Sequence, residues 1–131
     1  MFIDANIFLE YLLKDKKWVE AGKFLGRISE GEVGMTSDFI VYSILLRISH
    51  EKKVQLMKDF TMTLASMKGL RIARFSPQIL FNAVSLMEKN RLDFDDSLQV
   101  AFMQSLGIQQ IVSLDRDFER VPGIKRIEPG G

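Results

Sequence analysis

Short apolar segments of strand length alternate along this chain with longer segments of helical periodicity, and this alternation constrains the fold more than any other feature. Phe2-Ile3 opens the chain as a strand-like segment, and a continuous apolar run at residues 108–114 lies near its end. Strands that alternate with helices favour a parallel sheet with helices packed on its faces. We therefore predict a three-layer α/β/α architecture around a central, mostly parallel sheet.

The boundaries of the expected elements follow from apolar spacing and from residues that start or end helices. Ser37 and Ser76-Pro77 stand where helices should begin, and Gly107 stands where one should end. Strands are predicted at residues 2–3, 34–36, 70–75 and 108–114, and helices at residues 5–13, 18–28, 39–48, 51–67, 77–90 and 94–106. The helix at residues 39–48 is apolar on most sides, so we expect it to be largely buried or to pair with a second copy of the chain as a homodimer.

The bulk properties predict one cytoplasmic domain. The 131 residues suffice for a single hydrophobic core, so we expect one domain over residues 1–131 with a flexible tail at 128–131. The longest apolar stretch falls well short of the roughly 20 residues that a membrane span needs, and no signal-peptide pattern follows Met1. The absence of cysteine excludes disulfide frameworks, cysteine-bound zinc and thiol nucleophiles.

Four acidic residues stand at positions that a parallel sheet would bring together. Asp4 and Asp115 each directly follow a strand-like segment, and the pair Asp95-Asp96 opens a late helix. Ligands of such sheets lie beyond the carboxyl ends of the strands. Unit negative charges about 4 Å apart repel by several kcal/mol at an effective dielectric constant near 20, so a cluster of this kind favours a bound cation. Mg²⁺ or Mn²⁺, which prefer carboxylate oxygens, are the expected cofactors.

Three segments carry a resemblance to a known family. These are residues 2–9 (FIDANIFL), 92–98 (LDFDDSL) and 111–118 (IVSLDRDF). Their order and spacing resemble those of PIN domains, and the size of the chain is similar to that of the prokaryotic VapC-type toxins. The resemblance implies a metal-dependent endoribonuclease with Asp4, Asp96 and Asp115 at the metal. It also implies that Asn6 and Ser113 orient these acids by hydrogen bonds and that Asp117 is an auxiliary acid.

One position departs from the family pattern. PIN domains usually carry a glutamate in the helix after the second strand, and in residues 36–44 (TSDFIVYSI) this position falls on Ser43. A hydroxyl can hold a metal-bound water but brings no charge, so the affinity for a cation and the existence of a second metal position both depend on this replacement. Asp38 or Glu10 could substitute, although Asp38 lies more than one helical turn from Ser43 and neither matches the pattern.

Each acid also has an ordinary structural interpretation. Aspartate is favoured at helix N-termini and in turns, where its side chain bonds to nearby backbone amides. We expect Asp95 to cap its helix and Asp96 to serve the site, while Asp117 and Asp93 would be turn residues on this interpretation. The net charge of +1 does not by itself indicate a nucleic-acid binder, so RNA contacts would depend on local groups such as Lys14-Asp15-Lys16-Lys17.

Several functions therefore compete. The first is an endoribonuclease that cleaves RNA, as the toxin of a toxin-antitoxin pair whose small antitoxin partner covers the acidic pocket. The alternative is a catalytically impaired module that binds RNA or protein. A haloacid-dehalogenase-type phosphatase would need an acid where Asn6 stands, and a receiver domain would need its acid pair near the first strand. A Ser-His-Asp hydrolase lacks its elbow motif around Ser43 and His50.

Overall fold

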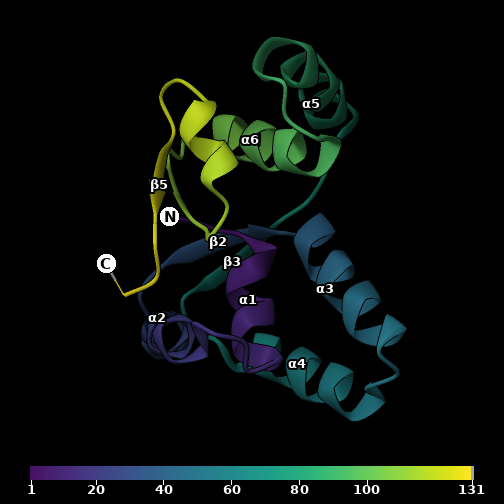
Figure 1. Ribbon diagram of the computed structural model, residues 1–131, viewed down its shortest axis with the longest axis vertical. Coiled ribbons are helices and arrows are strands. Elements are labelled where there is room, and N and C mark those ends of the chain that lie inside the picture. Colours follow the sequence, from purple (N-terminus) through teal and green to yellow (C-terminus); the bar gives the residue numbers. More distant parts are fainter. Residues whose placement is uncertain (131) are drawn as a thin grey trace.

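The computed structural model describes residues 1–130, which are built around a five-stranded parallel sheet (Figure 1). The strands are β1 (Phe2–Ile3), β2 (Gly34–Ser37), β3 (Leu70–Ala73), β4 (Gln110–Val112) and β5 (Lys125–Ile127), in the order β3-β2-β1-β4-β5. Every neighbouring pair is parallel. The first strand of the chain is therefore the central strand, and it pairs with a strand more than a hundred residues away.

Helices cover both faces of this sheet. They are α1 (Ala5–Leu12), α2 (Trp18–Glu30), α3 (Asp38–His50), α4 (Val54–Ser66), α5 (Pro77–Asn90) and α6 (Phe94–Leu106), and a 3₁₀ helix, η1 (Arg116–Arg120), follows β4. Figure 1 shows α1 to α4 on one side of the sheet and α5 and α6 on the other. The predicted three-layer α/β/α architecture is confirmed.

The pairing of β1 with β4 determines where the functional groups lie. Phe2 is in register with Ile111 and Ile3 with Val112, and all four side chains are fully buried. The chain leaves β1 toward β2 on one side and returns to β4 on the other, so the strand order reverses at β1. Ligands of open parallel sheets bind outside the carboxyl ends of the strands at such a reversal. Asp4 and the segment after Val112 lie at this point.

The residues expected to start and end helices do so. Ser37 Oγ accepts a hydrogen bond from the Ile40 amide at 3.2 Å, and Ser76 Oγ accepts one from the Ile79 amide at 3.2 Å. Each bond satisfies one of the backbone donors that a helix leaves free in its first turn. Gly107 ends α6 in the left-handed conformation, with φ of 69°, which glycine adopts without steric cost.

The helix α3 is less buried than its composition predicts. Only Ile40, Ile44 and Ile48 lie in the core along one face, whereas Tyr42 and Leu46 are each 62% exposed. The expectation that the helix is buried on most sides is wrong, because α3 packs on α1 and α4 with one face only and nothing in residues 1–130 covers the other.

The C-terminal part of the chain holds elements that the apolar pattern did not predict. The strand β5 has the sequence Lys125-Arg126-Ile127. A search for apolar segments does not find it, because two of its three residues are charged. Polar residues are tolerated there because β5 is an edge strand with only one neighbour. Of the tail expected at 128–131, residue 131 lies outside the described residues. Glu128 forms ion pairs and Pro129 is buried.

None of the helices in residues 1–130 combines the length and the apolar character that crossing a bilayer requires.

Gly69 gives a test of the close approach between β3 and the end of α2. A Cβ atom at Gly69 would lie 1.9 Å from the Glu32 carbonyl oxygen, which is backbone and cannot move aside cheaply. We expect Gly69→Ala to lower the free energy of unfolding in urea by about 1–3 kcal/mol, as overpacking typically does. The matched control is Gly26→Ala in α2, where a Cβ would meet nothing within 4 Å. There, helix propensity predicts a gain of roughly 0.5–1 kcal/mol. Equal stabilities of the two variants would contradict this assignment of the contact.

Candidate metal centre

Asp4 stands at the junction of β1 and α1 and is the most buried acid of the site. Its side chain is 5% exposed, and its Oδ1 accepts a hydrogen bond from the Ala5 amide at 2.7 Å as the N-cap of α1. Its Oδ2 accepts hydrogen bonds from Asn6 Nδ2 at 3.0 Å and from Ser113 Oγ at 2.5 Å. The capping role and a role in the site are therefore compatible, because the two oxygens have different partners.

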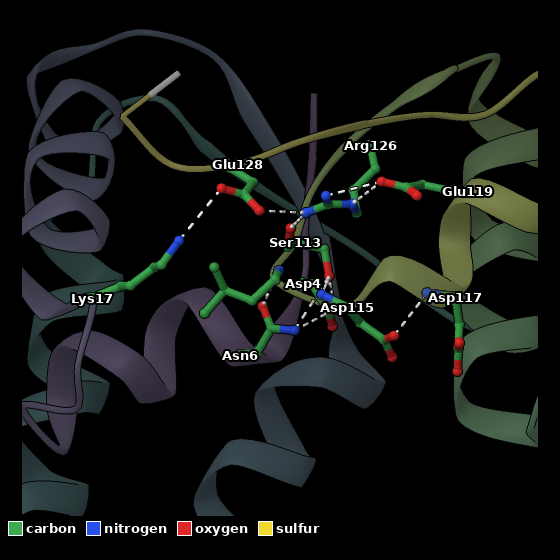
Figure 2. A network of polar contacts seen from close by, with 10 residues as sticks. Asp4, Asn6, Lys17, Ser113, Asp115, Asp117, Glu119, Arg126 and Glu128 are labelled. Carbon is green, nitrogen blue, oxygen red and sulfur yellow. Dashed lines mark hydrogen bonds and ion pairs between the residues drawn. The ribbon is translucent and has the colours of Figure 1, made fainter.

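Asn6 and Ser113 join the end of β1 to the end of β4 (Figure 2). Asn6 Nδ2 also donates to Ser113 Oγ at 3.2 Å, and Asn6 Oδ1 accepts from the Leu114 amide at 3.2 Å. Ser113 Oγ in turn accepts from the Asp115 amide at 3.0 Å. These bonds fix the direction in which the Asp4 and Asp115 side chains leave the sheet, which is the geometry that the expected supporting role of Asn6 and Ser113 requires.

The aspartates singled out in the sequence line one pocket at the carboxyl edge of the sheet. The pocket has a volume of about 250 Å³. It is lined by Asp4, Ala5, Asn6, Leu9, Phe39, Ile40, Ser43, Asp95, Asp96, Gln99 and Asp115. Asp4, Asp96 and Asp115 come from three segments that are far apart in the sequence, and the fold brings them together.

Asp117 does not line the pocket, but it belongs to the group of acids that lie closest to one another, and Asp4 is not part of that group. Carboxylate oxygens of Asp96, Asp115 and Asp117 all lie within 4.8 Å of one another. Asp115 also accepts a hydrogen bond from the Asp117 amide at 2.9 Å, and Asp117 pairs with Arg120 at 3.1 Å. Asp117 therefore lies in the first turn of the 3₁₀ helix η1, and not in a simple turn as its structural interpretation predicts. It is also close enough to share a cation with Asp96 and Asp115.

The carboxylates in the pocket repel one another. Burial, followed by repulsion from Asp115, Asp95, Asp4 and Asp117, raises the pKa of Asp96 to about 7. Burial also raises the pKa of Asp4, although its hydrogen bond from Ser113 acts in the opposite direction. A divalent cation would remove this conflict, because it favours the ionised form of every carboxylate around it.

Asp95 does not have the role expected of it. The helix α6 begins at Phe94 with Asp93 at the N-cap position, so Asp95 lies inside the first turn and cannot cap it. Its carboxylate accepts a hydrogen bond from the Asp96 amide at 3.1 Å and lines the pocket. The expectation of a capping Asp95 is wrong, because the chain adopts helical geometry two residues earlier than that role requires.

Ser43 lies in the pocket wall without adding charge. Its hydroxyl donates to the Ile40 carbonyl of its own helix at 2.9 Å. Neither acid considered as a substitute replaces it. The Asp38 carboxylate accepts from the Phe39 and Phe75 amides, and Glu10 accepts from the Lys17 amide, so both are engaged outside the pocket.

Gln99 is a pocket residue that the sequence analysis missed. Its side chain is 4% exposed and lines the pocket beside Asp4 and Asp96. The spacing contains the signal that could have found it, because Gln99 stands three residues after Asp96 in α6 and such residues share a helix face. A polar residue on the apolar face of a buried helix is the feature to look for.

A comparison with family models decides the classification. The model of the PIN domain matches residues 1–124, which is nearly the whole chain. The chain belongs to the PIN domain family. No curated protein sequence matches it significantly.

Solved structures share the PIN fold at low sequence identity. The chain is similar to VapC20 of Mycobacterium tuberculosis, a toxin that cleaves the Sarcin-Ricin loop, with a TM-score of 0.80, 18% identity and 98% of both chains covered. A toxin-antitoxin complex from Klebsiella pneumoniae matches with a TM-score of 0.74 and 20% identity over 98% of this chain and 96% of the other. VapBC2 of Rickettsia felis, bound to promoter DNA, matches with a TM-score of 0.75 and 17% identity over 97% and 96%.

The donor set of this PIN domain fits a hard divalent cation. Asp4, Asp96 and Asp115 line the pocket, and Asp96, Asp115 and Asp117 form the group whose carboxylate oxygens lie within 4.8 Å of one another. Oxygen is the ligand that Mg²⁺ and Mn²⁺ prefer. The raised pKa of Asp96 shows that the pocket without a cation holds its carboxylate at a cost.

The raised pKa of Asp96 predicts how stability depends on pH. The folded state binds the Asp96 proton more tightly than the unfolded state, so the metal-free protein loses stability as pH rises between about 4 and about 7. Asp96→Asn removes this contribution. In EDTA, the melting temperature of wild type should therefore fall relative to that of Asp96→Asn across this range. If the melting temperatures of wild type and Asp96→Asn differ by the same amount at every pH, the pKa of Asp96 is not raised in the folded state.

Ser43 gives a second test of the pocket. We expect Ser43→Glu to tighten the binding of Mn²⁺ in a calorimetric titration, because it adds a carboxylate to the wall of the pocket. The matched control is Ser85→Glu in α5, where the exposed side chain lies outside the pocket and should leave Mn²⁺ affinity unchanged. An unchanged affinity in Ser43→Glu would count against a pocket-facing Ser43.

Proposed function

We propose that this PIN domain is an endoribonuclease that hydrolyses RNA phosphodiester bonds with the help of Mg²⁺ or Mn²⁺. The observation that carries the proposal is the convergence of Asp4, Asp96 and Asp115 from β1, α6 and the end of β4 on one pocket. Membership of the PIN domain family supports the same function. The site residues would be these three aspartates, with Asn6, Ser43, Ser113 and Asp117 in support.

The three aspartates of the pocket would have different roles. Asp4 is the fixed ligand, because its hydrogen bonds from Asn6 and Ser113 hold it in one orientation. The pKa of Asp96 is about 7 in the metal-free pocket, so a bound cation would favour its ionised form near neutral pH. The ion, when bound, would neutralise the phosphate and activate a water as nucleophile. Asp115, fixed by the Ser113 and Asp117 contacts, would complete the set of ligands.

We further propose that the protein is the toxin of a toxin-antitoxin pair and acts in the cytoplasm. The similar structure from Klebsiella pneumoniae is a toxin-antitoxin complex, and the one from Mycobacterium tuberculosis is a toxin that cleaves the Sarcin-Ricin loop. By analogy, a small antitoxin protein would cover the acidic pocket. Its own groups would have to be cationic or donate hydrogen bonds, because the pocket is rich in carboxylates.

A homodimer is part of the same proposal. The exposed side of α3 carries Tyr42 and Leu46, which with Leu45 and Met57 line a shallow apolar hollow against α4. Contiguous apolar surface of this kind is typical of protein interfaces. A second copy of the chain is the occupant that we propose.

The second candidate function is a catalytically impaired module that binds RNA or protein. The neutral Ser43 favours it, because this wall of the pocket brings no charge to a cation. The phosphatase alternative is disfavoured by Asn6, because an amide can donate hydrogen bonds to Asp4 and Ser113 but cannot transfer a proton as a carboxylic acid would.

Cleavage of single-stranded RNA separates the two candidates. With Mn²⁺ or Mg²⁺ we expect wild type to cleave, EDTA to stop cleavage, and Asp4→Asn to lower the rate by about 100-fold or more, since even second-shell partners of a metal are typically worth 10–100-fold in affinity or activity. Asp59→Asn is the control, because this exposed residue of α4 lies outside the pocket.

The opposite result would favour the binding module. If wild type neither cleaves RNA nor gains melting temperature from a divalent cation, the nuclease proposal fails. RNA binding measured under the same conditions would then become the relevant activity.

A further inference from the structure

A second hollow lies at the same edge of the sheet as the acidic pocket. It has a volume of about 520 Å³. Its lining residues are Asp38, Val41, Tyr42, Ile72 and Arg74. Ligand-binding clefts commonly measure roughly 300–1,000 Å³, so this hollow has room for a group of the size of a nucleotide. The helix α3 belongs to the walls of both sites, because its residues Phe39, Ile40 and Ser43 line the acidic pocket.

Arg74 places a cation beside the acids along this edge. It directly follows the last residue of β3, as Asp4 directly follows β1. Ala73 is in register with Ser37, the last residue of β2, so these neighbouring strands end at the same level. The strand β2 lies between β3 and β1, and two strand spacings of about 4.8 Å therefore put the backbones at Arg74 and Asp4 about 10 Å apart. Neighbouring nucleotides of one RNA strand can span this distance.

The charge of Arg74 is available to a ligand. The side chain is exposed and forms no ion pair within residues 1–130. The acid in the same hollow, Asp38, is engaged elsewhere, because its two oxygens accept hydrogen bonds from the Phe39 amide at 2.8 Å and the Phe75 amide at 3.1 Å. The second bond holds the residue after Arg74 against the start of α3. The segment that carries Arg74 is thus fixed while its guanidinium stays free for an anion.

Tyr42 adds an aromatic surface to the same hollow. It stands one helical turn after Asp38 in α3, so the two side chains share a face of the helix. The residue is 62% exposed, and Ile72, which is 45% exposed, adds apolar surface nearby. The bases of single-stranded RNA are open to stacking, and exposed aromatic rings are the surfaces on which they stack in RNA-binding proteins. The hollow therefore offers a place for a base next to a place for a phosphate.

This pair of groups favours a nucleotide over a segment of a protein partner. An apolar protein segment would cover Tyr42 and Ile72 but leave the charge of Arg74 without a counter-charge. A nucleotide supplies both a phosphate and the face of a base. The position at the edge points the same way, because an RNA strand that is cleaved in the acidic pocket has to continue past it.

We propose that this hollow is a subsite for one nucleotide of single-stranded RNA, in which Arg74 pairs with a backbone phosphate and the Tyr42 ring stacks on the adjoining base. The subsite holds the strand beside the phosphate that is to be cleaved. Ile72 forms the apolar side of the place for the base. The inference rests on the proposed function, because it takes RNA as the ligand.

The salt dependence of RNA binding tests the role of Arg74. A short fluorescein-labelled single-stranded RNA is titrated in EDTA at several salt concentrations and followed by fluorescence anisotropy. We expect Arg74→Gln to make the slope of log affinity against log salt shallower by about 0.7, the effect of losing one phosphate contact. The matched control is Arg71→Gln, which removes the same charge from β3 but lies outside the hollow and points to the other side of the strand. It should leave the slope unchanged.

Tyr42→Leu tests the stacking separately, because it keeps an apolar side chain and removes the ring. We expect the affinity for single-stranded RNA to fall about tenfold with the salt slope unchanged. The affinity for duplex RNA should stay the same, since its bases are already stacked. Tyr42 also lines the apolar hollow at which a second copy is proposed, so Leu46→Ala is the control for a weakened dimer. Equal losses of RNA affinity in Leu46→Ala and Tyr42→Leu would overturn the role in stacking.

The outcomes separate this inference from the function on which it rests. If wild type cleaves RNA with Mn²⁺ while Arg74→Gln and Tyr42→Leu bind it with the affinity and slope of wild type, the subsite is overturned and the nuclease proposal remains. If wild type binds RNA without cleaving it and both variants bind as expected, the nuclease proposal fails and the subsite stands. If wild type binds no single-stranded RNA at all, the subsite is overturned as well.

Discussion

The hydrogen bonds that join Asp4, Asn6 and Ser113 are the contacts on which the site depends. They connect the end of the central strand β1 to the end of β4, two segments separated by more than a hundred residues. The parallel pairing of Phe2 with Ile111 and Ile3 with Val112 brings these strand ends side by side. Because each polar atom of this group has a partner, the group can be buried at little cost and can hold a carboxylate in one orientation. The position of Asp115 follows, since its amide bonds to Ser113.

Arg126 of β5 and two glutamates form a second group of charges, which contacts the end of β4. The Arg126 side chain is only 7% exposed and donates to the Ser113 carbonyl at 3.0 Å, while it pairs with Glu119 at 2.9 Å and Glu128 at 3.2 Å (Figure 2). A buried cation of this kind is tolerated because both carboxylates and a carbonyl oxygen surround it. The acidic pocket differs from this group in how its charges are paired. Arg126 pairs with two carboxylates, whereas no Lys or Arg among residues 1–130 lines the pocket of Asp4, Asp96 and Asp115, and the proposed cation site rests on this difference.

Much of the fold could be predicted from local pattern. The helix α6 has the bounds that its apolar spacing indicates, and Ser37, Ser76 and Gly107 act at helix ends because their chemistry is local. The failure to predict β5 and the wrong expectation for the burial of α3 have the same cause. β5 is polar because it is an edge strand, and α3 exposes apolar side chains because no element of residues 1–130 covers its outer face. In both cases the position of the element in the sheet or layer, and not its own composition, decided how its residues are used.

The sequence by itself determined the order of the first four strands and the six α-helices along the chain, the acids at the strand ends and the absence of a charge at Ser43, since all of these are properties of single segments. Only the tertiary structure decided that Asp117 lies within reach of Asp96 and Asp115, that Asp95 faces the pocket, and that Gln99 is buried there with an unpaired oxygen. The raised pKa of Asp96 belongs to the same class. Burial and the distances between charges arise from the packing of segments that are remote along the chain, and no local pattern contains them.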